Sequence, residues 1–238
     1  MMKIYEVDLY EPVQQYFKRL GYKVHGEVHH CDVAALKEEH LVIVELKLSL
    51  NIDLLIQATK RQRLTDMVYI AIPKPKFSLR TKKWKDICYL MRRLELGLMI
   101  VSFQKSGAYV EVKIHPSLFD RNKSMQVSRK KRDNIMKEIE GRHGDYNIGG
   151  SNQTKIMTAY KENCIHIACC LERFGPLSPK LLREFGTGDK TLSILHKNYY
   201  GWFERIKRGT YIINEKGKIE MQSYPEIVDF YKKSMKGL

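Results

Sequence analysis

The chain has 238 residues, of which 43% are hydrophobic, and its 42 Lys and Arg against 27 Asp and Glu give a formal net charge of +15. This hydrophobic content can fill the core of one large domain or two small ones, which argues against an intrinsically disordered chain. The positive charge favours a polyanionic partner, either nucleic acid or an anionic membrane, and does not by itself choose between them.

The excess of basic residues is concentrated in one stretch. Residues 1–60 carry a net charge of −2, residues 61–132 carry +13, and residues 133–238 carry +4. A phosphate-handling enzyme could use this contrast, with carboxylates holding a cation at the scissile bond and basic residues binding the flanking backbone. A solvated basic surface is the alternative interpretation.

The sequence has no sign of export or membrane insertion. Its first residues, MMKIYEVDLYEPVQQYF, include no apolar signal segment, and no run approaches the ~18 apolar residues that a membrane span needs. The five cysteines are odd in number and none has C-x2-C spacing, so we expect reduced thiols. We therefore expect a cytoplasmic protein with no membrane partner.

The first half of the chain predicts one α/β domain over residues 1–120. Apolar residues at helical spacing before Gly21 predict a first helix over residues 9–20, and Asn51 can cap a second. Strand-like runs lie between and after these helices, which gives the order αβββαβ. A basic loop over residues 74–83 follows, and then another helix and two strands are expected. The expected strands are 22–28, 32–36, 41–48, 67–72, 98–103 and 109–114, and the later helices are 51–64 and 84–96.

The second half predicts a linker and a smaller domain. Residues 121–150 are polar, include the basic run 129–132, and read as a basic linker with a helix. Residues 151–238 predict three helices, with the first running from Thr154 to about Phe174. Two strand-like runs then flank the basic turn Lys207-Arg208-Gly209, and a closing helix is expected at 224–235. This order is typical of a winged helix followed by a C-terminal helix.

A set of charged residues in an apolar strand indicates a catalytic site. Asp32 is followed, after twelve residues, by Glu45-Leu46-Lys47 within the run 41–48. Strand side chains alternate, so Glu45 and Lys47 should project together, and the hairpin should bring Asp32 to them. Burying such charges is costly unless they are paired or bind a metal. Two carboxylates suit Mg²⁺ or Mn²⁺, and a purely structural Glu45–Lys47 ion pair is the alternative.

This pattern resembles the PD-(D/E)XK superfamily of nucleases, whose core also has the order αβββαβ. The resemblance implies a restriction-endonuclease-like fold, with Asp32 and Glu45 as metal ligands and Lys47 as the catalytic lysine. It also implies a supporting role for Gln57, a phosphate contact for Arg61, and a further metal ligand in Glu11. The chain departs from the signature at Cys31, where the superfamily has proline.

A closer resemblance is to a bacterial family of uncharacterised PD-(D/E)XK phosphodiesterases with the same C-terminal module. It rests on the segments 147–151, 156–160 and 200–205, which read NIGGS, IMTAY and YGWFER. With the nuclease-like half, the similarity covers nearly the whole chain. It brings no known substrate with it.

Other residues have weaker claims to a role. His29, His30 and Glu27 lie near Asp32, but adjacent strand residues face opposite ways, so at most one of the two histidines can reach the site. Cys169 and Cys170 lie in an apolar helix and are expected to pack in the core. On the winged helix, the candidate nucleic-acid contacts are Lys190, Lys197, Lys207 and Arg208, although winged helices also dock proteins.

The sequence therefore predicts an Mg²⁺-dependent phosphodiesterase that cuts nucleic acid, with DNA expected ahead of RNA and the winged helix aiding substrate binding. Two rivals stand beside it: a DNA-binding regulator built on an inactive nuclease-like fold, and a protein-interaction scaffold. Strand specificity and internal or terminal cleavage stay open, as does assembly into a homodimer.

Overall fold

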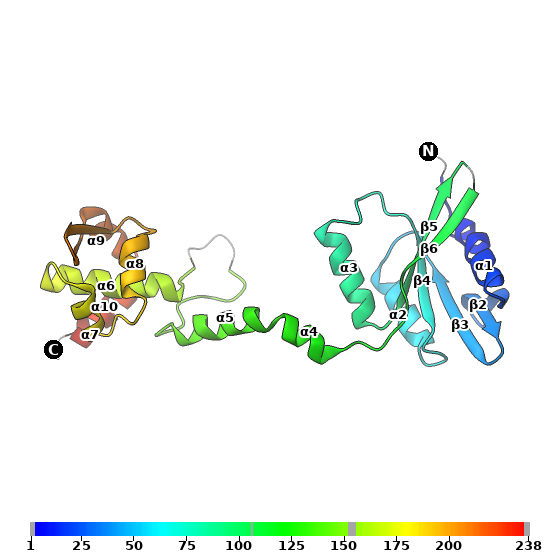
Figure 1. Cartoon of the computed structure of the whole chain (residues 1–238), viewed down its shortest axis with the longest axis horizontal. Coiled ribbons are helices and arrows are strands. Elements are labelled where there is room, and N and C mark those ends of the chain that lie inside the picture. Colours follow the sequence, from blue (N-terminus) through cyan, green and yellow to red (C-terminus); the bar gives the residue numbers. More distant parts are fainter. Residues whose placement is uncertain (1–2, 106, 152–155, 236–238) are drawn as a thin grey trace. The chain divides into compact units, whose positions relative to one another are not determined.

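The computed structural model describes residues 3–105, 107–151 and 156–235. The chain divides into two compact units, Met1–Ser124 (unit 1) and Met125–Leu238 (unit 2), which are labelled by element in Figure 1. No helix among the described residues is long and apolar enough to cross a membrane.

Unit 1 is built on a six-stranded mixed sheet whose strands are neighbours in chain order. Pairing is antiparallel from β1 to β3, parallel from β3 to β5, and antiparallel between β5 and β6. Because β3, β4 and β5 run parallel to one another, their carboxyl ends all lie at the same edge of the sheet. The strands are β1 (Lys23–Val28), β2 (Cys31–Lys37), β3 (His40–Leu46), β4 (Val68–Pro73), β5 (Gly97–Gln104) and β6 (Gly107–Ile114).

Helices cover both faces of this sheet (Figure 1). The short 3-10 helix η1 (Glu6–Leu9) and α1 (Tyr10–Arg19) pack on one face, and α2 (Ile52–Arg61) and α3 (Lys82–Arg93) pack on the other. Val42, Val44 and Leu46 of β3 belong to the core beneath α1. By strand alternation, Ile43 and Glu45 therefore face α2.

The predicted order of elements in unit 1 is confirmed from the first helix to the last strand. Local signals set several boundaries. The Asn51 side chain accepts a hydrogen bond from the backbone N–H of Leu54 at 2.8 Å and so caps α2. Gly21 turns the chain after α1 with a φ of +85°, and Pro73 is the last residue of β4.

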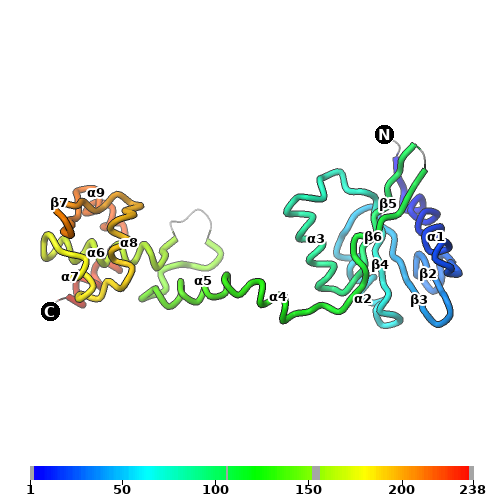
Figure 2. Tube along the Cα trace, viewed as in Figure 1, coloured from blue at the N-terminus to red at the C-terminus, as the bar shows by residue number. Residues whose placement is uncertain are grey.

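Unit 2 is organised around the long helix α6, ten of whose sixteen residues are buried. Figure 2 follows the chain from α6 through α7 and α8 into the β7–β8 hairpin. Leu177, between α6 and α7, forms a bridge with Tyr211 of β8 and so joins the hairpin. The elements are α5 (Arg129–Glu140), α6 (Ala159–Phe174), α7 (Pro179–Glu184), α8 (Thr191–Lys197), β7 (Phe203–Lys207), β8 (Thr210–Ile213), α9 (Glu215–Met221) and α10 (Pro225–Ser234), and α4 (Arg121–Val127) spans the boundary between the units.

The sequence patterns of unit 2 missed some helices. The region 121–150 holds two helices, α4 and α5, and the expected start of the long helix at Thr154 lies outside the described residues. Helix α9 was not anticipated because it is short and contains Gly217. A Cβ on Gly217 would lie 2.8 Å from Ile213 and 2.9 Å from Trp202, so close packing requires glycine there.

The cysteines behave as small apolar residues. All five are free and buried. Cys169 and Cys170 are fully buried in the core of unit 2, which confirms that they pack in the interior.

A buried histidine makes the stability of unit 2 sensitive to acid. His166 on α6 stacks on Tyr231 with ring centroids 4.0 Å apart, and burial lowers its pKa from 6.5 to about 4. Between these pH values the His166 imidazole is protonated in the unfolded chain but stays neutral in the folded unit. We therefore expect the free energy of unfolding of unit 2 to have its full value above pH 6.5. It should fall by an amount that approaches about 3 kcal/mol as the pH falls to about 4.

Urea unfolding of the full chain across this pH range measures the effect. Trp84 lies in unit 1 and Trp202 in unit 2, so a Trp84→Phe background lets fluorescence report unit 2 alone. His166→Gln should flatten the dependence on pH, whereas the exposed His196→Gln should leave it intact. An unchanged slope in His166→Gln would contradict the assignment.

Candidate active site

Asp32 and Glu45 lie together on the face of the sheet that is covered by α2. In the β2–β3 ladder the last pair is Val33 with Val44, so Asp32 and Glu45 are opposite each other one step further on. Asp32 Oδ2 accepts a hydrogen bond from the backbone N–H of Leu46 at 2.7 Å, which holds its carboxylate against β3. Glu45 is only 2% exposed. The hairpin therefore brings the two predicted metal-binding carboxylates into one place.

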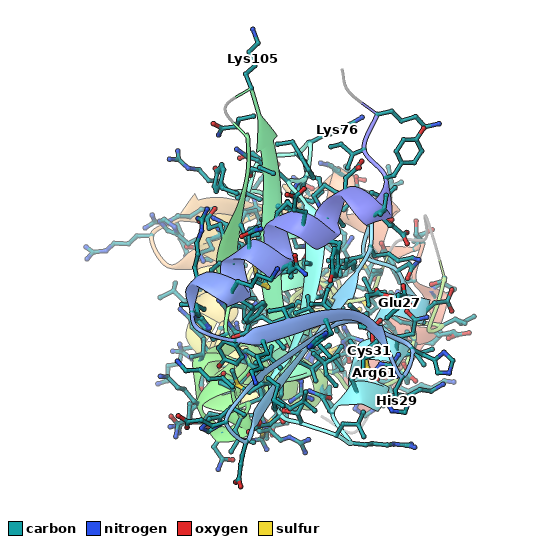
Figure 3. The ribbon with its side chains drawn as sticks, turned by 90° about the vertical axis from the view of Figure 1, so that its right-hand side faces the viewer. Glu27, His29, Cys31, Arg61, Lys76 and Lys105 are labelled. Atoms are coloured by element: carbon teal, nitrogen blue, oxygen red, sulfur yellow. The ribbon has the colours of Figure 1, made fainter. Side chains whose placement is uncertain are left out.

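Arg61, from the last turn of α2, is the charged partner of Glu45. Its Nε donates to Glu45 Oε1 at 2.6 Å, and its Nη2 donates to the backbone carbonyl of His30. Figure 3 shows Arg61 beside Cys31 where β1 turns into β2. A buried carboxylate needs such a partner, because an unpaired charge in the interior is strongly destabilising. The sequence pattern predicted a phosphate contact for Arg61, whereas the structure pairs it with Glu45.

The environment of Glu45 favours its neutral form despite this ion pair. Burial raises the pKa of Glu45 above 4.5, the negative charge of Asp32 raises it further, and the hydrogen bond from Arg61 opposes both effects. Two carboxylates this close repel each other. A divalent cation between them would relieve that repulsion and favour the ionised form of Glu45.

Lys47 extends away from the two carboxylates to another acidic residue. Its backbone N–H continues the β3–β4 ladder by donating to the carbonyl of Ala71, but its Nζ forms an ion pair with Glu6 Oε2 at 3.0 Å. Strand alternation predicted that Lys47 would project with Glu45. Regular β3 ends at Leu46, so alternation no longer dictates the direction of the next side chain. The side chains of Lys47 and Glu6 are 36% and 44% exposed, which leaves this pair open to solvent.

The structure thus adds Glu6, which the sequence did not single out, and gives Arg61 a carboxylate partner in place of the predicted phosphate. Glu6 of η1, and not Glu11 of α1, reaches Lys47; Arg61, and not Gln57, hydrogen bonds Glu45. Glu11 and Gln57 are exposed, and neither forms a hydrogen bond or ion pair with another residue that the structure describes. Glu6 was missed because the first helix was expected to start at Leu9. Arg61 is one helical turn beyond Gln57, a spacing that keeps both on one face of α2.

The other candidate ligands lie at the tight β1–β2 turn, with His29 and His30 in the turn and Glu27 near the end of β1. Glu27, His29 and His30 all have positive φ angles, between 47° and 63°, so the turn sets their backbone conformation. Burial raises the pKa of the neighbouring Cys31, which keeps it a thiol. Within the described part of the chain, no group of three His, Cys, Asp or Glu could hold a metal ion. The acidic pair itself therefore carries the argument for a cation.

The predicted nucleic-acid contacts of unit 2 are accessible. Lys190 precedes α8, Lys197 ends it, and Lys207 and Arg208 lie at the end of β7 and in the hairpin turn. All four are exposed, and none forms an ion pair with a described residue. Of the aromatic residues between α8 and β7, Trp202 is fully buried and Phe203 is 5% exposed, so both pack in the core, whereas Tyr199 is 74% exposed.

Comparison with known proteins finds one family model that matches the chain. A six-stranded mixed sheet carrying paired acids at the β2–β3 hairpin is compatible with a PD-(D/E)XK-like core. The family model "Putative PD-(D/E)XK phosphodiesterase (DUF2161)" matches residues 99–220, more than half of the chain. The chain therefore belongs to this family.

The extent of the match matters for the site. Residues 99–220 take in β5, β6 and most of unit 2, but they stop short of Asp32, Glu45 and Lys47. No curated protein and no solved structure matches the chain. The argument for the site residues therefore rests on their geometry.

Proposed function

We propose that the chain is a metal-dependent phosphodiesterase that hydrolyses nucleic acid, DNA ahead of RNA, with Asp32 and Glu45 as its metal-binding carboxylates. The observation that carries this proposal is the buried Glu45 set against Asp32, two acids that share one positively charged neighbour, Arg61. Membership of a phosphodiesterase family and a net charge of +15 support a phosphate-containing substrate.

The acidic pair fits Mg²⁺ or Mn²⁺ in its donor chemistry. Mg²⁺ is commonly bound through one or two carboxylates together with waters and substrate phosphates, whereas structural zinc takes four protein ligands. One oxygen of Asp32 accepts from Leu46 and one of Glu45 accepts from Arg61, so both carboxylates are oriented by the protein beside each other. A bound ion would acidify an attacking water and offset charge that develops on the phosphodiester.

Other residues of the chain would orient the metal-binding carboxylates and stabilise charge on the substrate. Arg61 orients the Glu45 carboxylate from α2, and Leu46 orients that of Asp32. Lys47 supplies a positive charge at the carboxyl end of β3, where it can stabilise negative charge on the reacting phosphate. Glu6 holds the Lys47 amine in place until a phosphate competes for it.

We assign unit 2 the role of a winged helix that helps to hold the substrate. The order α6, α7, α8 and a β-hairpin, with Leu177 bridged to β8, supports this assignment. The exposed Lys190, Lys197, Lys207 and Arg208 give it a surface suited to phosphate contacts.

One experiment tests the activity. The purified full chain is incubated with labelled single-stranded, double-stranded and branched DNA and RNA in Mg²⁺, in Mn²⁺ and in chelator. We expect cleavage with metal and none in chelator. Binding without cleavage would instead favour the second candidate, a DNA-binding regulator on an inactive nuclease-like fold. The observation that favours that candidate is Arg61, which neutralises Glu45 where a metal ion would.

Metal binding should strengthen as pH rises. The pKa of Glu45 is raised, so between pH 4.5 and its folded pKa the native state holds a proton that the unfolded chain has lost. Rising pH through this window therefore destabilises the metal-free unit, while it also frees the carboxylate for a cation. We expect the increase in melting temperature caused by Mn²⁺ to grow with pH across the window. Glu45→Gln should abolish that growth, and a pH-independent Mn²⁺ effect in the wild type would contradict it.

A further inference from the structure

A groove opens at the edge of the sheet where the three parallel strands end. It has a volume of about 790 Å³ and is formed by the residues after β3, the end of β4 with the loop that follows it, the start of α3, and the end of β5. The N-terminal segment before η1 closes it from the other side. The carboxyl edge of parallel strands is where α/β sheets commonly bind ligands.

The rim of this groove is strongly basic. Lys3, Lys74, Lys76 and Lys83 line it, and no acidic residue does. All four side chains are exposed, and none forms an ion pair with a residue in the described part of the chain. Figure 3 shows Lys76 projecting at the end of unit 1 where η1 begins. A row of unpaired ammonium groups over an open groove is complementary to a chain of phosphates.

The floor of the groove is apolar and partly aromatic. Leu48, Leu50 and Ile72 contribute to it, together with Phe77 and Phe103. The ammonium of Lys83 lies 5.0 Å from the centre of the Phe77 ring, so charge and aromatic surface meet at one point. A regular duplex presents its phosphates outward and keeps its base faces stacked inside. An unpaired strand presents phosphates and free base faces together, which matches this rim and floor.

The groove begins next to the Lys47–Glu6 ion pair along both chain segments. Leu48, a lining residue, directly follows Lys47, and Ile4, another, lies two residues before Glu6. The Lys47–Glu6 ion pair thus joins two of the chain segments that line the groove. The chain leaves β3 after Leu46 and bends at Leu48, so the groove begins three residues beyond Glu45.

From these observations we infer that the groove binds a single-stranded nucleic-acid segment next to the scissile phosphate, with lysines on its phosphates and Phe77 and Phe103 against its bases. This inference rests on the proposed function and adds its substrate class. The enzyme then acts on single strands, or on single-stranded extensions of duplexes.

Binding measured in chelator tests the groove separately from catalysis. Fluorescence anisotropy of the full chain with a labelled single-stranded oligonucleotide is compared with a duplex of the same length over a series of salt concentrations. Lys74→Gln/Lys76→Gln should weaken single-strand binding by about tenfold and reduce the salt slope by about 1.4, because each phosphate contact on a single strand contributes about 0.7. The matched control is Lys18→Gln/Lys23→Gln, two exposed lysines of unit 1 outside the groove, which should change neither value.

The aromatic floor is tested by Phe77→Leu and Phe103→Leu, which keep apolar bulk and remove the ring. Each should weaken single-strand binding several-fold and leave duplex binding unchanged, since stacking acts only on exposed bases. Circular dichroism and thermal melting establish that the variants fold. Equal affinity for single strand and duplex, or lysine variants that bind like the wild type, would overturn the inference.

The two proposals fail in different ways. Single-strand binding that depends on the groove, without cleavage in Mg²⁺ or Mn²⁺, would retain the groove and remove the catalytic proposal. Metal-dependent cleavage that is indifferent to strand type and to the groove variants would retain the activity and remove the groove.

Discussion

Glu45→Gln is expected to lower the rate of metal-dependent cleavage by about 10³-fold, because it removes one of two carboxylates that hold the cation. Glutamine keeps the shape of the side chain and an oxygen that can accept the hydrogen bond from Arg61. The variant therefore loses a charge at a buried position without losing the contact between β3 and α2.

The measurement has two parts, cleavage under single-turnover conditions and binding of Mn²⁺ by calorimetry. Glu39→Gln, an exposed residue of the β2–β3 turn, makes the same chemical change on the same hairpin and should retain wild-type values. Thermal melting of Glu45→Gln accompanies these measurements, because the substitution removes a buried charge and also the charged partner of Arg61. A Glu45→Gln variant that cleaves at the wild-type rate would end the catalytic assignment.

Lys47→Met is expected to reduce the cleavage rate by about 10²- to 10³-fold and to leave Mn²⁺ binding nearly unchanged. Methionine preserves an unbranched apolar stem and removes the positive charge that, in the proposed mechanism, leaves Glu6 for the reacting phosphate. Because Lys47 contacts neither Asp32 nor Glu45, the cation should bind as before. This separation of rate from metal binding distinguishes Lys47 from the carboxylates.

Glu6→Gln provides the companion measurement for Lys47. If Glu6 only positions the lysine, Glu6→Gln should lower the cleavage rate by about tenfold, far less than Lys47→Met does. The Glu6→Gln/Lys47→Met double variant should then be no slower than Lys47→Met alone. Additive losses in the double variant would mean that Glu6 acts independently of Lys47. Glu11→Gln in parallel tests the first acidic residue of α1 that the sequence pattern had suggested.

Arg61 links the two candidate functions. Its guanidinium pairs with the buried Glu45 and also holds the β1–β2 turn through the carbonyl of His30, so it stabilises the hairpin with or without a cation. In an active enzyme it would share Glu45 with the metal ion. In a regulator, Arg61 would neutralise Glu45 permanently and no metal ion would bind there. Metal binding by the wild-type chain separates these two situations.

The sequence by itself determined the order of elements in unit 1 and the meeting of Asp32 with Glu45. Both follow from local physics: hydrophobic periodicity distinguishes helix from strand, and the short turn over residues 37–40 sets the hairpin register. Turn and cap residues such as Gly21 and Asn51 marked the ends of helices in the same way. The burial of Cys169 and Cys170 also followed from the sequence, because both lie within an apolar helix.

Only the tertiary structure decided which charges are paired. Glu45 meets a residue 16 positions away on α2, and Lys47 meets one 41 positions away on η1. These contacts depend on how the helices pack on the sheet, and a strand pattern carries no information about that packing. The basic groove likewise draws on five separate segments, which become neighbours only when three parallel strands end at one edge.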